Sequence, residues 1–129
     1  MSFFGPPGYV SVPLDVTYTA LRGNYEFKTG YDCGKTFLTT VDGIVVNFTP
    51  LVPGNVVCFY IGGPHGLELI PHHEDGIMYK GHGIKGLSMV NMSRKAGDYI
   101  KLASLNGDPN SLGTKLWHVI DARGNWLKK

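Results

Sequence analysis

Glycine and proline interrupt this chain so often that only short extended segments can form between them. Its 129 residues include 18 glycines and 8 prolines, and nowhere do ten or more residues show the hydrophobic period of a helix. The runs between the breaks are rich in β-branched and aromatic residues, which favour strands. We expect strands at residues 15–21, 25–28, 36–41, 44–48, 55–61, 67–70, 77–80, 87–93, 99–105 and 115–122. The sequence therefore predicts an all-β fold, a single small β-sandwich or jelly roll.

Two patterns within these runs predict local structure. Asp42-Gly43 separates two of the runs and is the commonest two-residue hairpin signal, so we expect those runs to pair as a hairpin. Residues 55–61 form an apolar run, which at this length indicates a strand covered on both faces. Cys58 lies in this run and is expected to be a buried small hydrophobic residue. Cys33 is the only other cysteine, so no disulfide framework is expected, and pairing of the two is the minor alternative.

Residues 1–14 differ from the rest of the chain and predict an extended N-terminal arm before a sandwich domain at residues 15–129. The arm is rich in proline, glycine and aromatic residues, and its prolines block regular strand pairing. An exposed Phe3-Phe4 pair would be a liability on a monomer. We expect Phe3, Phe4 and Tyr9 to pack on a neighbouring subunit, with packing on the chain's own domain as the equal alternative.

The charge and hydropathy of the chain limit its partners. Charged residues make up 17% of the sequence, against about a quarter in typical soluble proteins, which suits a surface that lies against other protein. The net charge of +2 and the scattered basic residues do not indicate nucleic-acid binding. The N-terminus lacks the features of a signal peptide, and no apolar stretch approaches the ~20 residues of a membrane span. We expect no nucleic-acid or membrane partner, and a chain kept in the cytoplasm or in particles assembled there.

The histidine-rich segment 65–82 is the main candidate for metal chemistry. Its imidazole and carboxylate side chains suit zinc and similar cations, with His72, His73 and His82 as the candidate ligands. Adjacent His72 and His73 would point to opposite sides of a strand, and the two histidines one helical turn apart of a zincin motif are missing. We therefore expect a solvated polar loop without metal. A metal that bridges subunits at a symmetry axis is the functional alternative.

No other pattern predicts catalysis or a cofactor. Cys33 beside Asp32, and serines such as Ser88 and Ser104, lack a nucleophile elbow. The glycine pairs contain neither a Walker sequence nor a dinucleotide fingerprint. We expect no catalytic residue, no cofactor and no enzymatic activity.

Seven short segments follow one another along about three-quarters of the chain. They are Asp32-Cys-Gly-Lys-Thr-Phe37, Pro53-Gly54, residues 55–61, Leu67-Glu-Leu-Ile-Pro71, Gly97-Asp-Tyr-Ile-Lys-Leu102, Trp117-His-Val-Ile120 and Gly124-Asn-Trp126. This order resembles a pattern in virion proteins of tailed bacteriophages, in which an Asp-x-Gly-Lys-x-Phe segment, a Pro-Gly turn and a Gly-Asp strand precede a Trp-x-Val-Ile strand and a final Gly-x-Trp. The segments carry no catalytic signature. The histidine-rich segment and the loop at residues 106–114 depart from the pattern.

The resemblance implies a β-sandwich or jelly-roll module that trimerises in a virion. A separately made chain of this size fits a capsid decoration (cement) protein, which stabilises the shell by bridging subunits of the major capsid protein. Repetition around the shell multiplies a modest affinity through avidity. In such a homotrimer we expect Phe3, Phe4, Tyr9 and Trp126 at the interfaces between subunits. The resemblance also implies that the protein is located in the virion.

Two alternatives stay open. The first is a tail-fibre or baseplate module that binds a host receptor or glycan, and an exposed aromatic groove near Trp126 would favour it. The second is a jelly-roll metal-binding protein or enzyme, which would retain zinc or iron and lose it when His72 and His73 are replaced by alanine.

Overall fold

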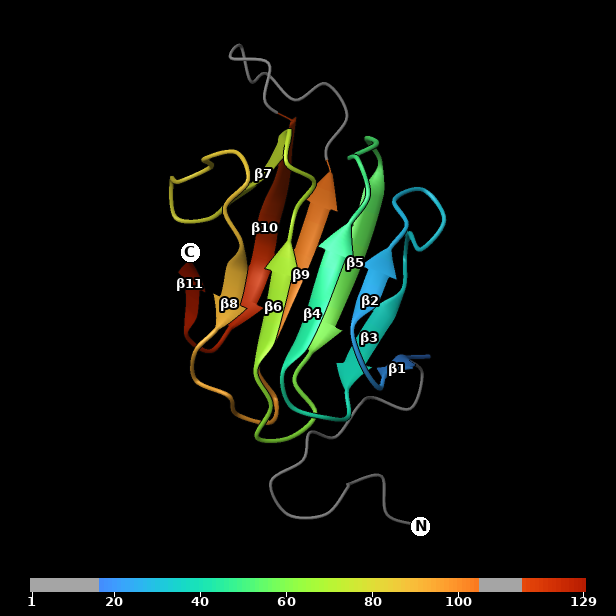
Figure 1. The fold of residues 1–129 in the computed structure, drawn as a ribbon, viewed down its shortest axis with the longest axis vertical. Helices are drawn as coiled ribbons and strands as arrows, with labels where there is room; N and C mark the ends of the chain where they lie inside the picture. The colour runs from blue at the N-terminus through green and yellow to red at the C-terminus, as the bar shows by residue number, and fades with distance from the viewer. Residues whose placement is uncertain (1–16, 105–114) are drawn as a thin grey trace.

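The computed structural model describes residues 17–104 and 115–129 as two β-sheets packed face to face (Figure 1). Sheet A contains, in spatial order, β1 (Thr19–Leu21), β3 (Thr36–Thr39), β5 (Asn55–Tyr60), β9 (Tyr99–Ser104), β10 (Lys115–Arg123) and β7 (Asp75–Met78). Sheet B contains β11 (Trp126–Lys128), β8 (Met89–Asn91), β6 (Leu67–Ile70), β4 (Ile44–Phe48) and β2 (Tyr25–Phe27). The prediction of an all-β sandwich is confirmed. The expected arm at residues 1–14, with Phe3, Phe4 and Tyr9, lies outside the described residues, as does the loop at 106–114.

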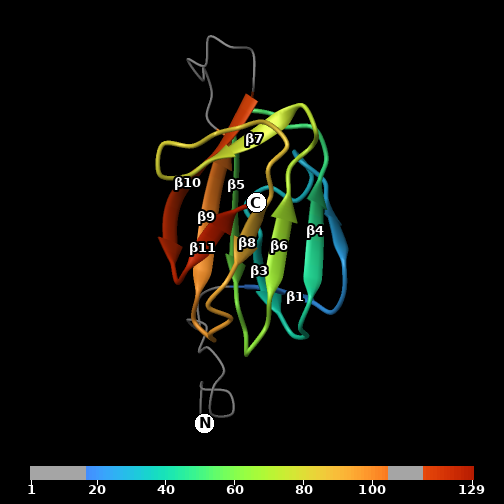
Figure 2. The same ribbon diagram turned by 60° about the vertical axis from the view of Figure 1, so that its left-hand side comes forward.

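The first six strands wind between the two layers that Figure 2 shows. Each of β1 to β4 pairs in parallel with the strand two positions later in the chain. Parallel neighbours need a crossover of about a dozen residues or more, which is usually a helix. Here a strand of the opposite sheet serves as that crossover, so parallel pairing arises among the described residues without a helix. The topology therefore differs from the antiparallel order of a jelly roll.

The later strands complete both sheets with antiparallel pairs. β9 lies between β5 and β10 and is antiparallel to both, while β8 pairs antiparallel with β6 and with β11. β7 pairs in parallel with the first half of β10 and forms the end of sheet A. The end strands β7 and β11 lie on the same side of the sandwich (Figure 1). No helix in the part of the chain that the structure describes is long and apolar enough to cross a membrane.

The hairpin predicted at Asp42-Gly43 is wrong. The strands on either side, β3 and β4, belong to different sheets and do not pair. Gly43 has a φ of 76° and turns the chain, while an Asp42 carboxylate oxygen accepts a hydrogen bond from the Gly66 N–H at 2.7 Å. Phe37 of β3 and Ile44 of β4 both face the core, but from opposite layers. The same turn residues therefore carry the chain across the edge of the sandwich.

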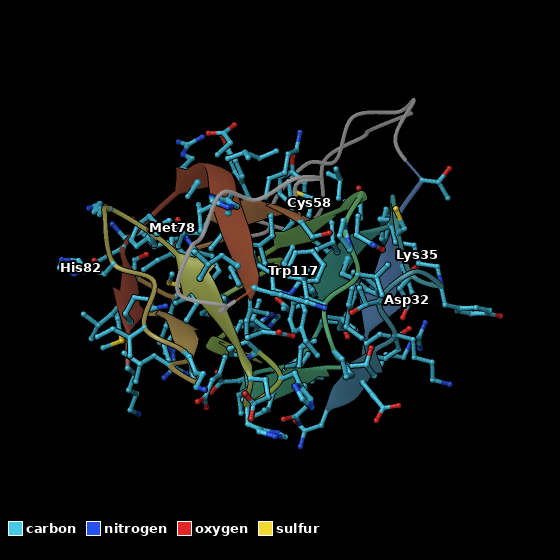
Figure 3. The ribbon with its side chains drawn as sticks, turned by 90° about the horizontal axis from the view of Figure 1, so that it is seen from above. Asp32, Lys35, Cys58, Met78, His82 and Trp117 are labelled. Carbon is cyan, nitrogen blue, oxygen red and sulfur yellow. The ribbon has the colours of Figure 1, made fainter. Side chains whose placement is uncertain are left out.

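Aromatic side chains from both sheets fill the middle of the core. Trp117 of β10 is fully buried and packs edge-on against Phe27 at 5.9 Å and Phe48 at 5.3 Å between ring centroids. Phe37 and Phe59 stack in parallel at 5.2 Å. Figure 3 shows Trp117 between the two sheets. Because these rings come from strands far apart in sequence, their packing joins the two layers into one core.

The expectation that residues 55–61 are covered on both faces is wrong for the outer side of β5, where Val56 is exposed and Tyr60 is half-buried. Val57 and Phe59 face the core, but Val56 on the outer side of β5 is 42% exposed. Cys58, also on the outer side, is buried as expected, and burial raises the pKa of its thiol to about 11. Cys58 and Cys33 are both free thiols. Cys58 therefore acts as a small hydrophobic residue that stays protonated at neutral pH.

Candidate functional site

The outer face of sheet A is the first candidate site, because apolar side chains continue across several strands. Side chains alternate between the two faces of a strand, so the pairing register identifies each outward row. One row runs from Ala20 to Leu38, Tyr60 and Tyr99 on four adjacent strands. Cys58 lies in the next row, between Thr36 and Lys101, and Val56 and Ala103 form the row after it. Figure 3 places Cys58 on the outer side of the sheet. We call the four residues of the first row, together with Cys58, Val56 and Ala103, the outer A patch.

The outer A patch has the composition of a protein interface. The rings of Tyr60 and Tyr99 lie 5.4 Å apart, and tyrosine is enriched where proteins meet. Three charges border the patch: Asp121 stands opposite Lys101 and Arg123 opposite Tyr99 in the register, and the Asp121 carboxylate accepts a hydrogen bond from the Tyr99 hydroxyl at 2.9 Å. Their opposite signs reduce the cost of covering them with a partner.

The outer face of sheet B is less suited to burial. Its central residue is Glu68, which lies between Val45 and Val90 in the register. Glu68 forms no salt bridge within the described parts of the chain. Covering an unpaired carboxylate with protein removes its hydration, and this desolvation costs on the order of several kcal/mol of binding free energy. The outer A patch is therefore the better protein-binding face.

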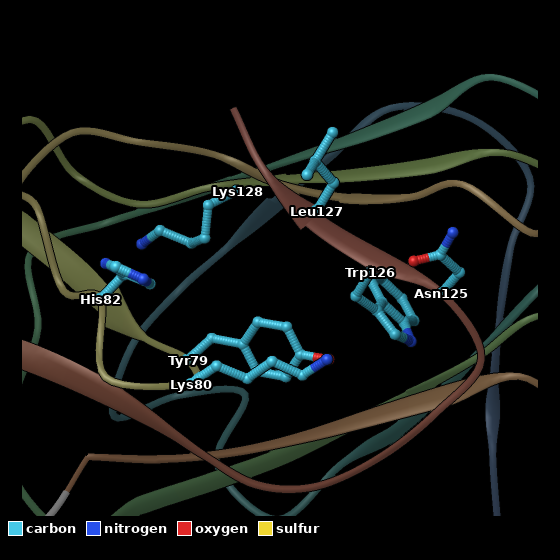
Figure 4. Close-up of a pocket in the computed structure, with 7 residues that line it drawn as sticks. All are labelled: Tyr79, Lys80, His82, Asn125, Trp126, Leu127 and Lys128. Atoms are coloured by element: carbon cyan, nitrogen blue, oxygen red, sulfur yellow. The ribbon is translucent and has the colours of Figure 1, made fainter.

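A pocket of about 450 Å³ beside β11 is the second candidate site (Figure 4). It lies between the turn that follows β7 and the C-terminal strand, with His82 and Lys128 at one end and Asn125 and Trp126 at the other. Its lining consists of Tyr79, Lys80, His82, Asn125, Trp126, Leu127 and Lys128. Two lysines, a histidine and two aromatic rings line this pocket, and no acidic side chain does.

A tight turn forms one wall of the pocket. Tyr79 and His82 exchange backbone hydrogen bonds of 2.9 and 3.0 Å. The two residues between them, Lys80 and Gly81, have φ values of 50° and 81°, the positive pair of a type I′ turn. A lysine is uncommon in this conformation. The turn holds the Lys80 ammonium 5.2 Å from the centroid of the Tyr79 ring, within reach of a cation–π interaction.

Strand β11 forms the other wall. Trp126 is 4% exposed, so only an edge of its ring reaches the pocket, and its indole N–H donates to the carbonyl oxygen of Arg123 at 2.9 Å. The Lys128 ammonium donates to the carbonyl oxygen of Ile77, which ties the end strands of the two sheets together. Burial lowers the pKa of Lys128 below its usual value. The ammonium has three N–H donors, and the carbonyl uses one of them.

The turn before β11 positions Asn125 and Trp126. Gly124 has a φ of 101° and lies against the buried Asp98 carboxylate, which a Cβ at this position would approach to 2.4–2.6 Å. Asp98 accepts hydrogen bonds from Asn91 Nδ2 and Ser93 Oγ. Ser93 Oγ in turn accepts from the Asn125 N–H at 2.9 Å. The segment Gly97-Asp98 and the final Gly-Asn-Trp therefore meet in space and hold this wall in place.

The histidines expected as metal ligands lie in two places. His72 and His73 lie in the loop before β7, where the sequence predicted a loop, and their ring centroids are 4.1 Å apart. His72 Nδ1 accepts from the Glu74 N–H at 3.3 Å, and His73 Nε2 lies 3.5 Å from a Glu74 carboxylate oxygen. His82 lines the pocket instead. Among residues 17–104 and 115–129, no group of three or more potential ligands is arranged to hold a metal.

Asp32, in the first segment of the phage-like pattern, has a structural role. Its buried carboxylate accepts hydrogen bonds from Lys35 Nζ at 2.7 Å and from the Tyr25 hydroxyl and the Lys28 N–H at 2.9 Å each. Burial alone would raise the pKa of Asp32, but these hydrogen bonds outweigh it and lower that pKa. The Asp-x-Gly-Lys segment thus closes the loop between β2 and β3.

Replacing Asp32 with asparagine should lower the free energy of unfolding by about 1–3 kcal/mol at pH 7, because hydrogen bonds to a charged, buried acceptor are lost. The folded-state pKa of Asp32 lies below the unfolded value of about 3.9. Its ionisation therefore stabilises the fold above about pH 4, and this stabilisation disappears as the pH falls through the folded-state pKa. Urea unfolding from pH 7 down to pH 2.5 should show the two proteins converging. A difference that stays constant with pH would contradict the ionic role.

Sequence reasoning singled out Trp126 and His82 in this region but missed Tyr79, Lys80 and Lys128. The signal that could have located the turn is Lys80-Gly81 between Tyr79 and His82, since a residue followed by glycine is typical of type I′ turns. Trp126 is in the core cluster, and its expected interface role stays a prediction.

Comparisons with protein families, with curated proteins and with solved structures found no match to this chain.

Proposed function

We propose that this chain is a structural virion protein of a tailed bacteriophage, a capsid decoration (cement) protein that bridges subunits of the shell. The observation that carries the proposal is the outer A patch, an apolar and aromatic face that continues over four adjacent strands of sheet A. The order of sequence segments supplies the virion assignment, as a resemblance. Val56, Cys58, Tyr60 and Tyr99 of the patch also belong to segments of that pattern, so the two arguments share these residues, and only Ala20, Leu38 and Ala103 lie outside it.

The outer face of sheet A is large enough for a stable contact. Six strands at the usual spacing of about 4.8 Å span roughly 24 Å, and a six-residue strand is about 20 Å long. Specific interfaces bury about 800 Å² per partner, and a face of these dimensions supplies most of that area. In a homotrimer we place the outer A patch at the contact between copies, and avidity then strengthens the contacts of the trimer with the shell.

The test is the solution mass of the purified chain and of two matched valine variants. We expect light scattering to give three times 14.1 kDa for the wild-type protein. Val56 in the outer A patch and Val41 in the turn between β3 and β4 are both 42% exposed, so neither substitution should unfold the domain. Val56→Lys should reduce the mass to that of the monomer, and Val41→Lys should leave it unchanged.

Other outcomes would count against the proposal in different ways. A wild-type monomer would contradict the homotrimer. A trimer that both variants retain would show that the outer A patch is not the contact. The cement role itself is tested by sedimentation with undecorated capsid shells, in which wild-type protein should pellet and Val56→Lys should stay in the supernatant.

A second candidate function is a tail-fibre or baseplate module that binds a host receptor. The pocket beside Trp126 supports it, because aromatic groups and convergent polar groups line the pocket. This candidate does not exclude assembly through the outer A patch, since pocket and patch share no residue.

A further inference from the structure

The pocket beside β11 has a chemistry that selects its ligand. Within the described residues, the salt bridges are Lys35–Asp32, His73–Glu74, Lys85–Glu74 and Arg94–Asp42. Lys80 and Lys128 take part in none of these, and both ammonium groups lie in the pocket lining. A partly buried cation with a carbonyl as its hydrogen-bond partner gains more from an anion than a solvated surface lysine does. The pocket is therefore suited to an anionic ligand.

The other lining groups favour a sugar over a simple ion. The Tyr79 ring, on the side away from the Lys80 ammonium, offers a flat apolar surface against which the C–H face of a sugar ring can lie, and the edge of Trp126 adds an apolar contact. The Asn125 amide and the His82 ring can bond hydroxyl groups. A volume of about 450 Å³ is in the usual range for small-ligand sites and exceeds what an inorganic anion needs.

We propose that this pocket binds a sugar residue that carries a carboxylate, of the uronic or sialic acid type, with the carboxylate at the Lys128 end. The proposal rests on the second candidate function and specifies the class of receptor. Figure 4 shows the Lys128 ammonium and the His82 ring together at that end, while the aromatic groups extend toward Asn125. The Lys80 ammonium lies beside the Tyr79 ring, away from the Lys128 end, and attracts the anion from a greater distance through its positive charge. Since the pocket is open and small, we expect a Kd on the order of 1 mM for a single sugar.

The experiment is an NMR titration of the full chain with glucuronate, and with glucose and sodium phosphate at matched ionic strength. The two tryptophan indole N–H signals report on different places: Trp126 lines the pocket, and Trp117 is fully buried between the sheets. Glucuronate should shift the Trp126 signal and leave the Trp117 signal in place. Glucose and phosphate should bind at least about tenfold more weakly, because each lacks one half of the recognised group.

Three lysine variants test whether glucuronate binding depends on the positive charges of the pocket rather than on the stability of the fold. Lys128→Gln should weaken glucuronate binding about tenfold and Lys80→Gln about threefold. Lys80 lies at the tip of an exposed turn, so Lys80→Gln keeps the test valid if Lys128→Gln unfolds the protein. Lys95→Gln, an exposed lysine outside the pocket lining, is the matched control and should bind like the wild type.

The results of the titration show separately whether the charged-sugar proposal fails and whether the receptor-binding function fails. Equal binding of glucose and glucuronate would overturn the requirement for a carboxylate and still support a glycan receptor. Equal binding of phosphate would show a general anion site and overturn the sugar. If none of the three ligands shifts the Trp126 signal, the inference is wrong and the receptor function loses the observation that favours it.

Discussion

Replacing Trp117 with alanine should lower the free energy of unfolding by about 3–5 kcal/mol, the usual cost of truncating a large buried aromatic residue. Trp117 is fully buried and packs edge-on against Phe27 and Phe48, which belong to the opposite sheet. The truncation would leave a cavity at the point where the two layers meet. Urea unfolding followed by far-ultraviolet circular dichroism measures the change without depending on the lost fluorophore.

Two further substitutions make this result interpretable. Trp117 Nε1 has no hydrogen-bond partner among the described residues, so Trp117→Phe removes a buried unpaired donor along with part of the ring. We expect Trp117→Phe to cost at least about 2 kcal/mol less than Trp117→Ala. Ile120 on the same strand is 51% exposed, and Ile120→Ala should change stability by no more than about 0.5 kcal/mol. A Trp117→Ala variant as stable as Ile120→Ala would contradict the central role of this ring.

Replacing Gly124 with alanine should destabilise the protein by about 2–5 kcal/mol and disrupt the pocket. A φ of 101° is unfavourable for any residue with a Cβ, and this strain costs about 1–2 kcal/mol. The new Cβ would also lie 2.4–2.6 Å from the Asp98 carboxylate, whose hydrogen bonds restrict its movement. Overpacking of this kind adds about 1–3 kcal/mol. Thermal and urea unfolding should show the loss, and the Trp126 indole signal should shift because its strand is displaced.

Gly54 provides the matched control for Gly124. It has a φ of 89°, but no atom lies within 4 Å of a Cβ placed there. Gly54→Ala therefore introduces the backbone strain without the steric clash. We expect Gly124→Ala to be more destabilising than Gly54→Ala by about 1–3 kcal/mol. Equal losses would show that Asp98 moves aside freely and does not hold the turn.

The local character of the chain could be predicted well from sequence. Most expected runs contain a shorter strand, as with residues 15–21 and 87–93, which contain β1 and β8. The run 77–80 only overlaps β7, which begins at Asp75, and β11 was not expected. Trp117 and Val119, two positions apart on β10, both face the core, as regular alternation along a strand requires. Ile120 lies at a β-bulge, which the regular alternation could not indicate. Burial of Cys58 was also predicted, because it depends on an apolar run in the sequence.

The partners of each strand could not be predicted in the same way. The Asp42-Gly43 pair favours a hairpin, yet β3 and β4 lie in different sheets. Alternation of polar and apolar residues tells which side of a strand faces the core. It does not tell whether the neighbouring strand comes from a hairpin or from a crossover. The parallel winding of β1 to β6 is therefore a property of the whole fold.

By itself, the sequence determined an all-β chain of short strands, because strand propensity, face alternation and turn residues act over a few neighbouring residues. The tertiary structure alone decided the outer A patch, since its row from Ala20 to Tyr99 exists only through the register of four strands. It also decided the pocket, in which Tyr79 and Lys128 meet across the end strands of two sheets. Contacts between residues so distant in sequence depend on the pairing and packing of whole sheets, which no local pattern encodes.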